Sequence, residues 1–172
     1  ICSINSFKVL SSSPSFVVLC FGSVRAGTGL IGGKFAMDVR LSRVLSDGFI
    51  DRASSNLKSF YLSGSYVGKK SLIKAVAFSG KERTYQSWYG TPESVIKGDA
   101  DEMNAYADRN YLSDVERANL LESGRSYNYY TYQDEVDNYQ QDNYQLHFTH
   151  TFSPKTTLNV AGHYTKGRGY YE

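Results

Sequence analysis

The chain has 172 residues, a formal net charge of +2 and an aromatic content of 15%, which comes from 15 Tyr, 9 Phe and a single Trp. This length allows one domain with a sizeable core, and neither the net charge nor any dense Lys/Arg stripe along the sequence indicates a nucleic-acid-binding protein. The sequence has no run of 18 consecutive apolar residues, which excludes a transmembrane helix.

The N-terminal segment, residues 1–20, is rich in serine and shows no clean periodicity. It contains both cysteines of the chain, Cys2 and Cys20, and no Cys or His spacing typical of a metal site occurs. The chain begins at Ile1, so we expect a fragment of a longer protein. We expect residues 1–20 to be an unpatterned N-terminal segment that is divergent, mistranslated or non-native.

From Gly22 onward, polar and apolar residues alternate, which predicts β-strands because successive side chains of a strand point to opposite faces. The first predicted strand ends at a Gly32-Gly33 turn, where glycine accepts the positive φ of a tight turn. In the next strand, Asp38 and Arg40 lie on the polar side, and we expect an ion pair between them. Further strands are predicted at 59–66 and 71–79, but the second is apolar on both parities and its faces are not assigned.

The segment 80–138 loses this alternation, and its length is typical of a functional or disordered loop. Within it, Asp114 to Glu122 is predicted to form a short helix with Asp at its N-cap. Alternation returns at about Gln140 and continues through a hairpin with a Ser153-Pro154-Lys155 turn.

The two halves of this hairpin are each about 10 residues long, which is the length that a tilted strand needs to cross a bilayer. The links between the predicted strands alternate between short and long, as in outer-membrane barrels with short turns on one side and long loops on the other. We therefore predict an all-β fold, an antiparallel meander of about six long strands that forms part of a transmembrane β-barrel. Barrels of this kind start at about 8 strands, which again predicts a fragment.

Three stretches of the chain share the features of one known family, namely RLSRVLSDGFIDRASSNLKSFYLSGSYVGKKS, FSGKERTYQSWYGTPES and DNYQQDNYQLHFTHTFSPKTTLNVAGHYTKGRGYYE. They resemble TonB-dependent outer-membrane receptors of the siderophore and nutrient type found in Bacteroidetes-like bacteria. The resemblance extends over roughly Arg25 to Glu172, and we assign residues 21–172 to a partial receptor barrel. The family fold is a 22-stranded barrel with a plugged lumen.

The resemblance implies transport of ferric siderophores or similar nutrients across the cell outer membrane. In that family, the TonB complex pulls on the plug by using the proton-motive force. The implied partners are the TonB complex, outer-membrane lipid and a small-molecule or metal-chelate substrate. The plug, the TonB box and most of the barrel strands have no counterpart in this sequence.

Aromatic residues at the start of the long loop, Tyr85, Trp88 and Tyr89, are candidates for stacking on a siderophore, haem or sugar. The alternative is packing within the loop, or an aromatic belt at the membrane interface. A second cluster has the same two interpretations and consists of Tyr127, Tyr129, Tyr130 and Tyr132. An acidic stretch in this loop, with Asp99, Asp101, Glu102 and Asp108, has no EF-hand spacing and is more typical of a solvated loop.

Six polar residues of the predicted strands are expected to face the barrel lumen, namely Asp38, Arg40, Gln145, His147, Asn159 and His163. The two histidines share one parity on neighbouring strands but lack the further ligands that a metal site requires. No catalytic motif or phosphate-binding loop is present, so we predict neither an enzyme nor a cofactor.

The alternative function is that of a soluble or surface-exposed antiparallel β-domain that binds a protein or a glycan through its Tyr-rich loops. The position of the apolar residues distinguishes the two functions. In a barrel these residues face outward in a band about 25 Å tall, and in a soluble domain they converge on a core.

Overall fold

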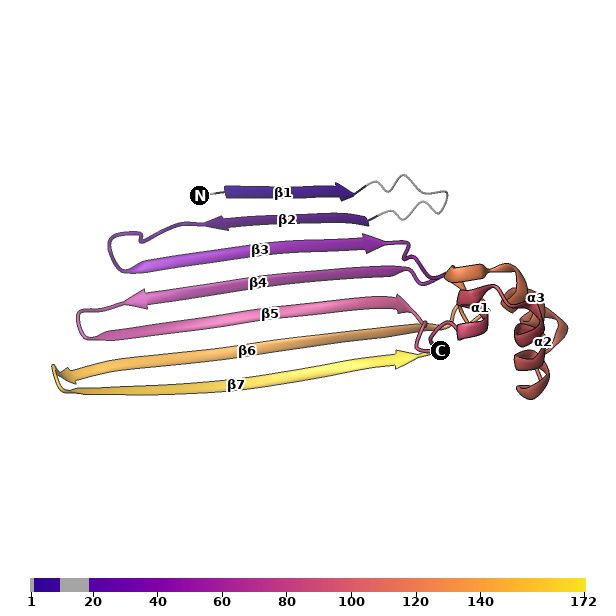
Figure 1. Cartoon of the computed structure of the whole chain (residues 1–172). Helices are drawn as coiled ribbons and strands as arrows, with labels where there is room; N and C mark the ends of the chain where they lie inside the picture. Colours follow the sequence, from indigo (N-terminus) through magenta and orange to yellow (C-terminus); the bar gives the residue numbers. More distant parts are fainter. Residues whose placement is uncertain (1, 10–18) are drawn as a thin grey trace.

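A computed structural model describes residues 2–9 and 19–172, with the side chains of the second range. The fold is a single seven-stranded antiparallel sheet in which the strands follow one another in sequence order (Figure 1). The strands are β1 (Cys2–Val9), β2 (Leu19–Gly27), β3 (Phe35–Ser46), β4 (Ser55–Val67), β5 (Ser71–Tyr85), β6 (Val136–Ser153) and β7 (Thr156–Tyr171). The all-β antiparallel meander is thereby confirmed.

The strands are longer than the alternation alone predicts. β5 continues to Tyr85 and β6 begins at Val136, so the intervening loop is 86–135 rather than 80–138. Polar residues that pair across the sheet extend these strands beyond their apolar portion, where a hydropathy pattern gives no signal. β1 was not predicted, because its segment has no alternating pattern. The rest of the segment 1–20, apart from Leu19 and Cys20, lies outside the described residues.

Connections of different length lie at opposite ends of the sheet (Figure 1). The turns at 28–34, 68–70 and 154–155 are at one end, which we call the turn end. The links 47–54 and 86–135 are at the other, which we call the loop end. Gly32 and Gly33 have φ of 56° and 67°, which confirms the predicted glycine turn.

Helices occur only in the loop between β5 and β6 among the described residues, and they are α1 (Glu93–Lys97), α2 (Ala100–Arg109), α3 (Asp114–Glu122) and η1 (Gly124–Ser126). They form a small core of their own around Val95, Met103, Ala107, Leu120 and Tyr127. This helical group lies beyond the loop end and covers neither face of the sheet (Figure 1). Within residues 2–9 and 19–172, no helix is long and apolar enough to span a membrane.

Helix α3 matches the predicted bounds, but its N-cap was predicted wrongly. The cap is Ser113 and not Asp114, and the Ser113 side chain forms a capping box with Glu116. Glutamate three residues after a serine is the sequence signal of this motif, so Ser113 was the better choice for the cap.

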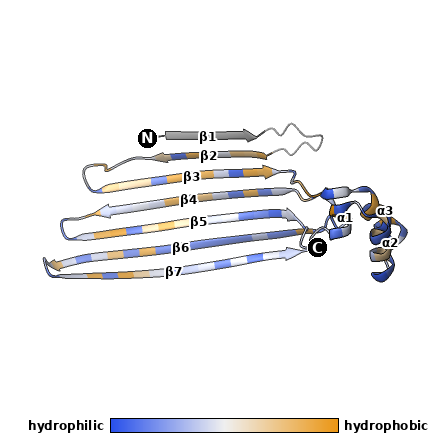
Figure 2. Cartoon of the chain, viewed as in Figure 1, coloured by the Kyte–Doolittle hydropathy of each residue, from blue (hydrophilic) through white to orange (hydrophobic). Residues whose placement is uncertain are grey.

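The pairing register defines the two faces of the sheet. One, the apolar face, carries Phe35, Met37, Val39, Leu41, Leu62, Ile73, Leu146, Phe148, Leu158 and Val160. It is most apolar toward the turn end, whereas β5, β6 and β7 become hydrophilic toward the loop end (Figure 2). The other, the polar face, carries Ser, Thr, Asn, Gln and charged side chains together with a few large aromatic ones.

The register also assigns the faces of β5. Val76 is paired with Ser63 and Gln145 and therefore lies on the polar face, whereas Ala75 is paired with Gly64 and Leu146 on the apolar face.

Candidate functional site

The six residues predicted to face a lumen all lie on the polar face. Asp38 is connected through Ser63, Val76 and Gln145 to His163 in one unbroken line of paired residues. Arg40, His147 and Asn159 have the same parity on their strands and share this face. The pairing of the strands thus places all six on one side of the sheet, and their position in a lumen stays a prediction.

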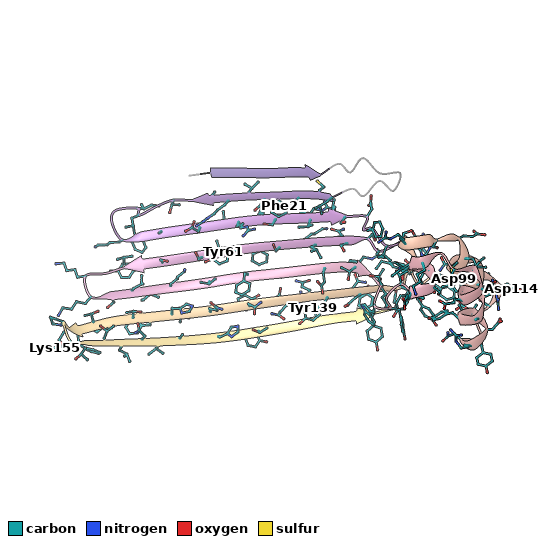
Figure 3. All side chains as sticks on the ribbon, viewed as in Figure 1. Phe21, Tyr61, Asp99, Asp114, Tyr139 and Lys155 are labelled. Atoms are coloured by element: carbon teal, nitrogen blue, oxygen red, sulfur yellow. The ribbon has the colours of Figure 1, made fainter. Side chains whose placement is uncertain are left out.

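Near the loop end of the polar face, a hollow of about 710 Å³ extends from β2 to β6. Its lining includes the aromatic residues Phe21, Tyr61, Phe78 and Tyr139 together with polar residues such as Arg40 and Asn143. Three of the aromatic residues, Phe21, Tyr61 and Tyr139, come from β2, β4 and β6 (Figure 3). A hollow of this size, with aromatic walls and a few polar groups, has the character of a small-molecule site.

These four aromatic residues were not among the predicted site residues. Tyr61 has the same parity as Ser59 and Ser63, and Tyr139 has the same parity as Gln141 and Asn143. A large aromatic residue within a polar parity is the signal that was available in the sequence. Tyr139 has room to lie across β7 because that strand has glycine there. A Cβ on Gly167 would lie 2.5 Å from the Tyr139 hydroxyl.

The predicted ion pair between Asp38 and Arg40 is wrong. Asp38 pairs with Arg25, whose Nη2 lies 3.0 Å from the Asp38 Oδ1. The Arg40 Nε instead donates to the hydroxyls of Ser23 and Ser42, at 3.1 Å each. Arg25 lies on β2, diagonally across from Asp38, at a separation that a long arginine side chain spans.

His147 and His163 lie on adjacent strands of the polar face but do not contact each other. The His147 Nε2 lies 3.2 Å from the Gln145 Oε1, and the His163 Nε2 lies 2.7 Å from the Thr165 hydroxyl. Within the described residues, no group of three or more His, Cys, Asp or Glu side chains is arranged to hold a metal ion.

A second candidate site is an aromatic cluster at the loop end, formed by Trp88, Tyr89, Tyr129, Tyr130 and Tyr171. The ring centroids of Tyr89 and Tyr129 are 4.8 Å apart, and those of Trp88 and Tyr130 are 6.3 Å apart. Trp88 and Tyr89 remain 65% and 62% exposed. The structure therefore joins the two aromatic stretches that the sequence presents separately, and Tyr171 from the end of β7 extends the cluster.

Tyr85, the third predicted ligand-binding residue, does not belong to this exposed cluster. It is the last residue of β5, it is 8% exposed, and its hydroxyl donates to the Tyr132 carbonyl oxygen. Its ring is buried because β5 continues to this position and the loop closes over the strand end. Tyr85 therefore has a structural role.

Buried polar contacts hold the aromatic cluster in place. The Asn128 Nδ2 donates to the carbonyl oxygens of Asp51 and Gln86, at 2.8 and 3.0 Å, and its Oδ1 accepts from the Tyr130 N–H at 3.1 Å. Arg52, from the link between β3 and β4, donates to the Tyr130 carbonyl oxygen at 3.0 Å. Two loops far apart in sequence are thereby fastened to each other, and this fixes the rings of the cluster.

Tyr127 and Tyr130 remain protonated well above neutral pH. Burial raises the pKa of Tyr127 to about 12. Burial, together with the neighbouring Tyr89, raises the pKa of Tyr130. Their hydroxyls are therefore neutral hydrogen-bond donors under physiological conditions.

The acidic stretch of the loop has structural partners. Asp99 is the N-cap of α2, where its Oδ1 accepts from the Glu102 N–H at 3.0 Å. Asp101 and Glu102 lie in the first turn of α2, where negative charge stabilises a helix, and Asp108 forms an ion pair with Arg117 of α3. These contacts account for the carboxylates without a bound cation.

The chain matches no protein-family model, no curated protein and no solved structure. These comparisons therefore neither support nor contradict the resemblance to TonB-dependent receptors.

Proposed function

We propose that this chain forms part of the β-barrel of an outer-membrane, TonB-dependent transporter for ferric siderophores or similar nutrients. The observation that carries the proposal is the exposed apolar face of the sheet. Phe35, Met37, Leu41, Leu146 and Val160 are each more than half exposed, and no described helix covers them. Such a band on a soluble protein is costly in water, whereas lipid is a suitable solvent for it.

The height of the apolar band supports the same proposal. Along β6, the apolar face from Tyr144 to Phe152 extends about 27 Å at the rise of an antiparallel strand. A strand tilted by about 40° would cover about 20 Å of membrane thickness, and outer-membrane barrels carry an apolar band about 25 Å tall.

Along this part of β6, His150 is the one polar residue on the apolar face, and its side chain forms a hydrogen bond. Its Nδ1 lies 2.7 Å from the Ser71 hydroxyl, and its ring lies between those of Phe148 and Phe152. Its polarity is therefore compatible with a position near the membrane interface at the turn end.

The polar face would line the lumen, and the aromatic-walled hollow would lie on the path of the substrate. The asymmetric connections support an orientation with the short turns toward the periplasm and the loop end toward the exterior. The exposed rings of Trp88 and Tyr89 would then meet the incoming ferric chelate before it reaches the hollow. Transport itself would require the plug and the TonB complex, which act through parts of such a receptor other than these strands.

Fluorescence quenching by brominated lipids tests this proposal on two adjacent residues of β6. In a Trp88→Phe background, Leu146→Trp introduces a reporter on the apolar face and Gln145→Trp a matched reporter on the polar face. In vesicles of brominated phosphatidylcholine, we expect strong quenching of the Leu146→Trp variant and little quenching of the Gln145→Trp variant. Equal quenching of both, or of neither, would contradict the proposed membrane face.

A second function has one observation in its favour, the exposed aromatic cluster at the loop end. Flat, exposed Tyr and Trp rings also suit a soluble β-domain that binds a glycan or a protein. A chain of that kind would remain in the supernatant when vesicles are sedimented, and neither tryptophan reporter would be quenched by lipid. The same vesicle experiment therefore separates the two functions.

A further inference from the structure

One line of paired residues crosses the apolar face just beyond the apolar band, on its loop-end side. From β3 to β7 this line reads Arg43, Lys58, Lys81, Gln140 and Arg168. We call its four charged members, Arg43, Lys58, Lys81 and Arg168, the basic row. They come from four different strands, which is why the sequence itself shows no Lys/Arg stripe.

The row nearer the band adds to this positive charge through Lys166. Arg83 lies one row nearer the loops and is paired with Asp134, whose Oδ1 lies 3.5 Å from the Arg83 Nη2. The one acidic residue among these three rows, Asp142, is already engaged. Its Oδ2 lies 3.2 Å from the Arg168 Nη1, its Oδ1 accepts from the Ser79 hydroxyl at 2.5 Å, and its side chain is only 14% exposed.

Three members of the basic row have no counter-charge. Arg43, Lys58 and Lys81 are exposed, and none of them has an ion pair or a side-chain hydrogen bond within residues 19–172. Each sits directly opposite the next, on strands about 4.8 Å apart. Like charges in directly opposed positions destabilise a sheet, so this arrangement favours an anion that bridges them.

We propose that the basic row binds the phosphate groups of anionic lipids in the membrane leaflet on the loop-end side. This inference rests on the proposed membrane function. If the apolar band lies in hydrocarbon, the basic row lies at the depth of the headgroups, where long Lys and Arg side chains extend toward the interface. A phosphate offers several acceptor oxygens, which match the ammonium groups of Lys58 and Lys81 and the two-pronged guanidinium of Arg43.

The test measures whether an anionic lipid is enriched beside the row. In a Trp88→Phe background, Phe60→Trp places a reporter one row inside the basic row, on the strand of Lys58. The vesicles are phosphatidylcholine with a minor fraction of brominated phosphatidylglycerol or, as reference, the same fraction of brominated phosphatidylcholine. We expect stronger quenching by the anionic lipid.

The decisive variant is Arg43→Gln/Lys58→Gln/Lys81→Gln. It should lose most of the preference, because each Lys or Arg near an anionic surface contributes a preference of about fivefold. The matched control, Lys34→Gln/Lys69→Gln/Lys155→Gln, removes the same charge from the three turns at the other end and should retain the preference. Removing opposed like charges relieves repulsion, so the decisive variant is expected to fold.

Each other outcome overturns the proposal in an identifiable way. Equal loss of preference in both triple variants would assign the effect to net charge. Full competition by inorganic phosphate would assign the row to a soluble anion and not to lipid. Quenching of the Leu146→Trp reporter without any lipid preference at Phe60→Trp would contradict lipid binding by the basic row and leave the membrane function standing. Absence of quenching at Leu146→Trp would reject the membrane function and the lipid site together.

Discussion

Asn128 is fully buried in the loop between β5 and β6, next to the buried Tyr127. Its side-chain amide donates hydrogen bonds to the backbone carbonyl oxygens of Asp51 and Gln86. Asn128 therefore connects the link 47–54 to the loop 86–135. Because the Trp88 and Tyr130 rings are carried by this fastened region, the geometry of the aromatic cluster depends on a residue that belongs to no ring contact.

Replacing Asn128 with Ala should therefore loosen the loop. The substitution leaves two carbonyl oxygens and one N–H without their partner, which should cost about 2–3 kcal/mol of local stability. Hydrogen exchange of the backbone amides around residues 127–135 would report it as faster exchange. Gln133→Ala, an exposed residue of the same loop, should change exchange little. Unchanged protection in Asn128→Ala would mean that the ring contacts alone hold the cluster.

The ligand role of the aromatic cluster is tested at Tyr89, whose ring packs against both Tyr129 and Tyr130. Tyr89→Ala should weaken binding of ferric chelates by about three- to tenfold, the range of aromatic pair energies of about 0.5–1.5 kcal/mol. Quenching of the Trp88 fluorescence on titration with a ferric hydroxamate or catecholate would measure this. Tyr111→Ala removes a tyrosine that is 94% exposed and outside the cluster, and it should have no effect. Equal weakening in both variants would contradict the assignment.

At the level of elements, α3 shows how a short helix is stabilised at its first turn. The Glu116 Oε2 accepts from the Ser113 N–H at 2.8 Å and from the Ser113 hydroxyl at 2.6 Å. These hydrogen bonds hold the pKa of Glu116 below its usual value. The folded-state pKa is thus lower than that of the unfolded chain. This stabilisation is present above the unfolded pKa, about 4.3, and is lost as the pH falls through the folded one.

Ser113→Ala should therefore cost about 1 kcal/mol of helix stability at neutral pH and reduce the acid dependence of that stability. Hydrogen exchange of the α3 amides, measured at neutral and acidic pH, would report both effects. Asp114→Ala is the matched control, because Asp114 lies next to the cap and does not form the capping box. A larger loss of helix stability in Asp114→Ala than in Ser113→Ala would indicate that Asp114 is the capping residue, as the sequence analysis predicted.

At the scale of the whole molecule, the sheet is two-sided, and β7 forms one of its edges. Every residue of β7 is exposed, and the apolar side chains of Val160 and Tyr164 lie on the apolar face. An exposed edge next to an uncovered apolar face is a template for association between chains.

We therefore expect the chain to aggregate in detergent-free buffer and to be dispersed by detergent, as measured by light scattering. Val160→Lys/Tyr164→Lys, on the apolar face of β7, should reduce aggregation. Asn159→Lys/His163→Lys, on the polar face of the same strand, should leave it nearly unchanged while adding the same number of lysines. A monodisperse monomer in detergent-free buffer would contradict the expectation, and it would favour the soluble β-domain.

Local features of the chain were predictable from the sequence alone. Alternation is a property of a single strand, so the opposite faces of Leu146 and His147 follow from their parity without any knowledge of neighbours. Gly32 and Gly33 mark their turn because few other residues accept a positive φ. The helix at Asp114–Glu122 was likewise predictable, although its capping residue was placed one position too late.

Features that depend on pairing were decided only by the tertiary structure. The faces of β5 were ambiguous because both of its parities are apolar, and only the register with β4 and β6 separates Ala75 from Val76. The aromatic cluster joins Trp88 to Tyr130 across a folded loop, and the basic row joins Arg43 to Lys81 across three strands. A sequence records which side of its own strand a residue occupies. Which residue lies opposite is set by the hydrogen-bonded register between strands, and that register is non-local.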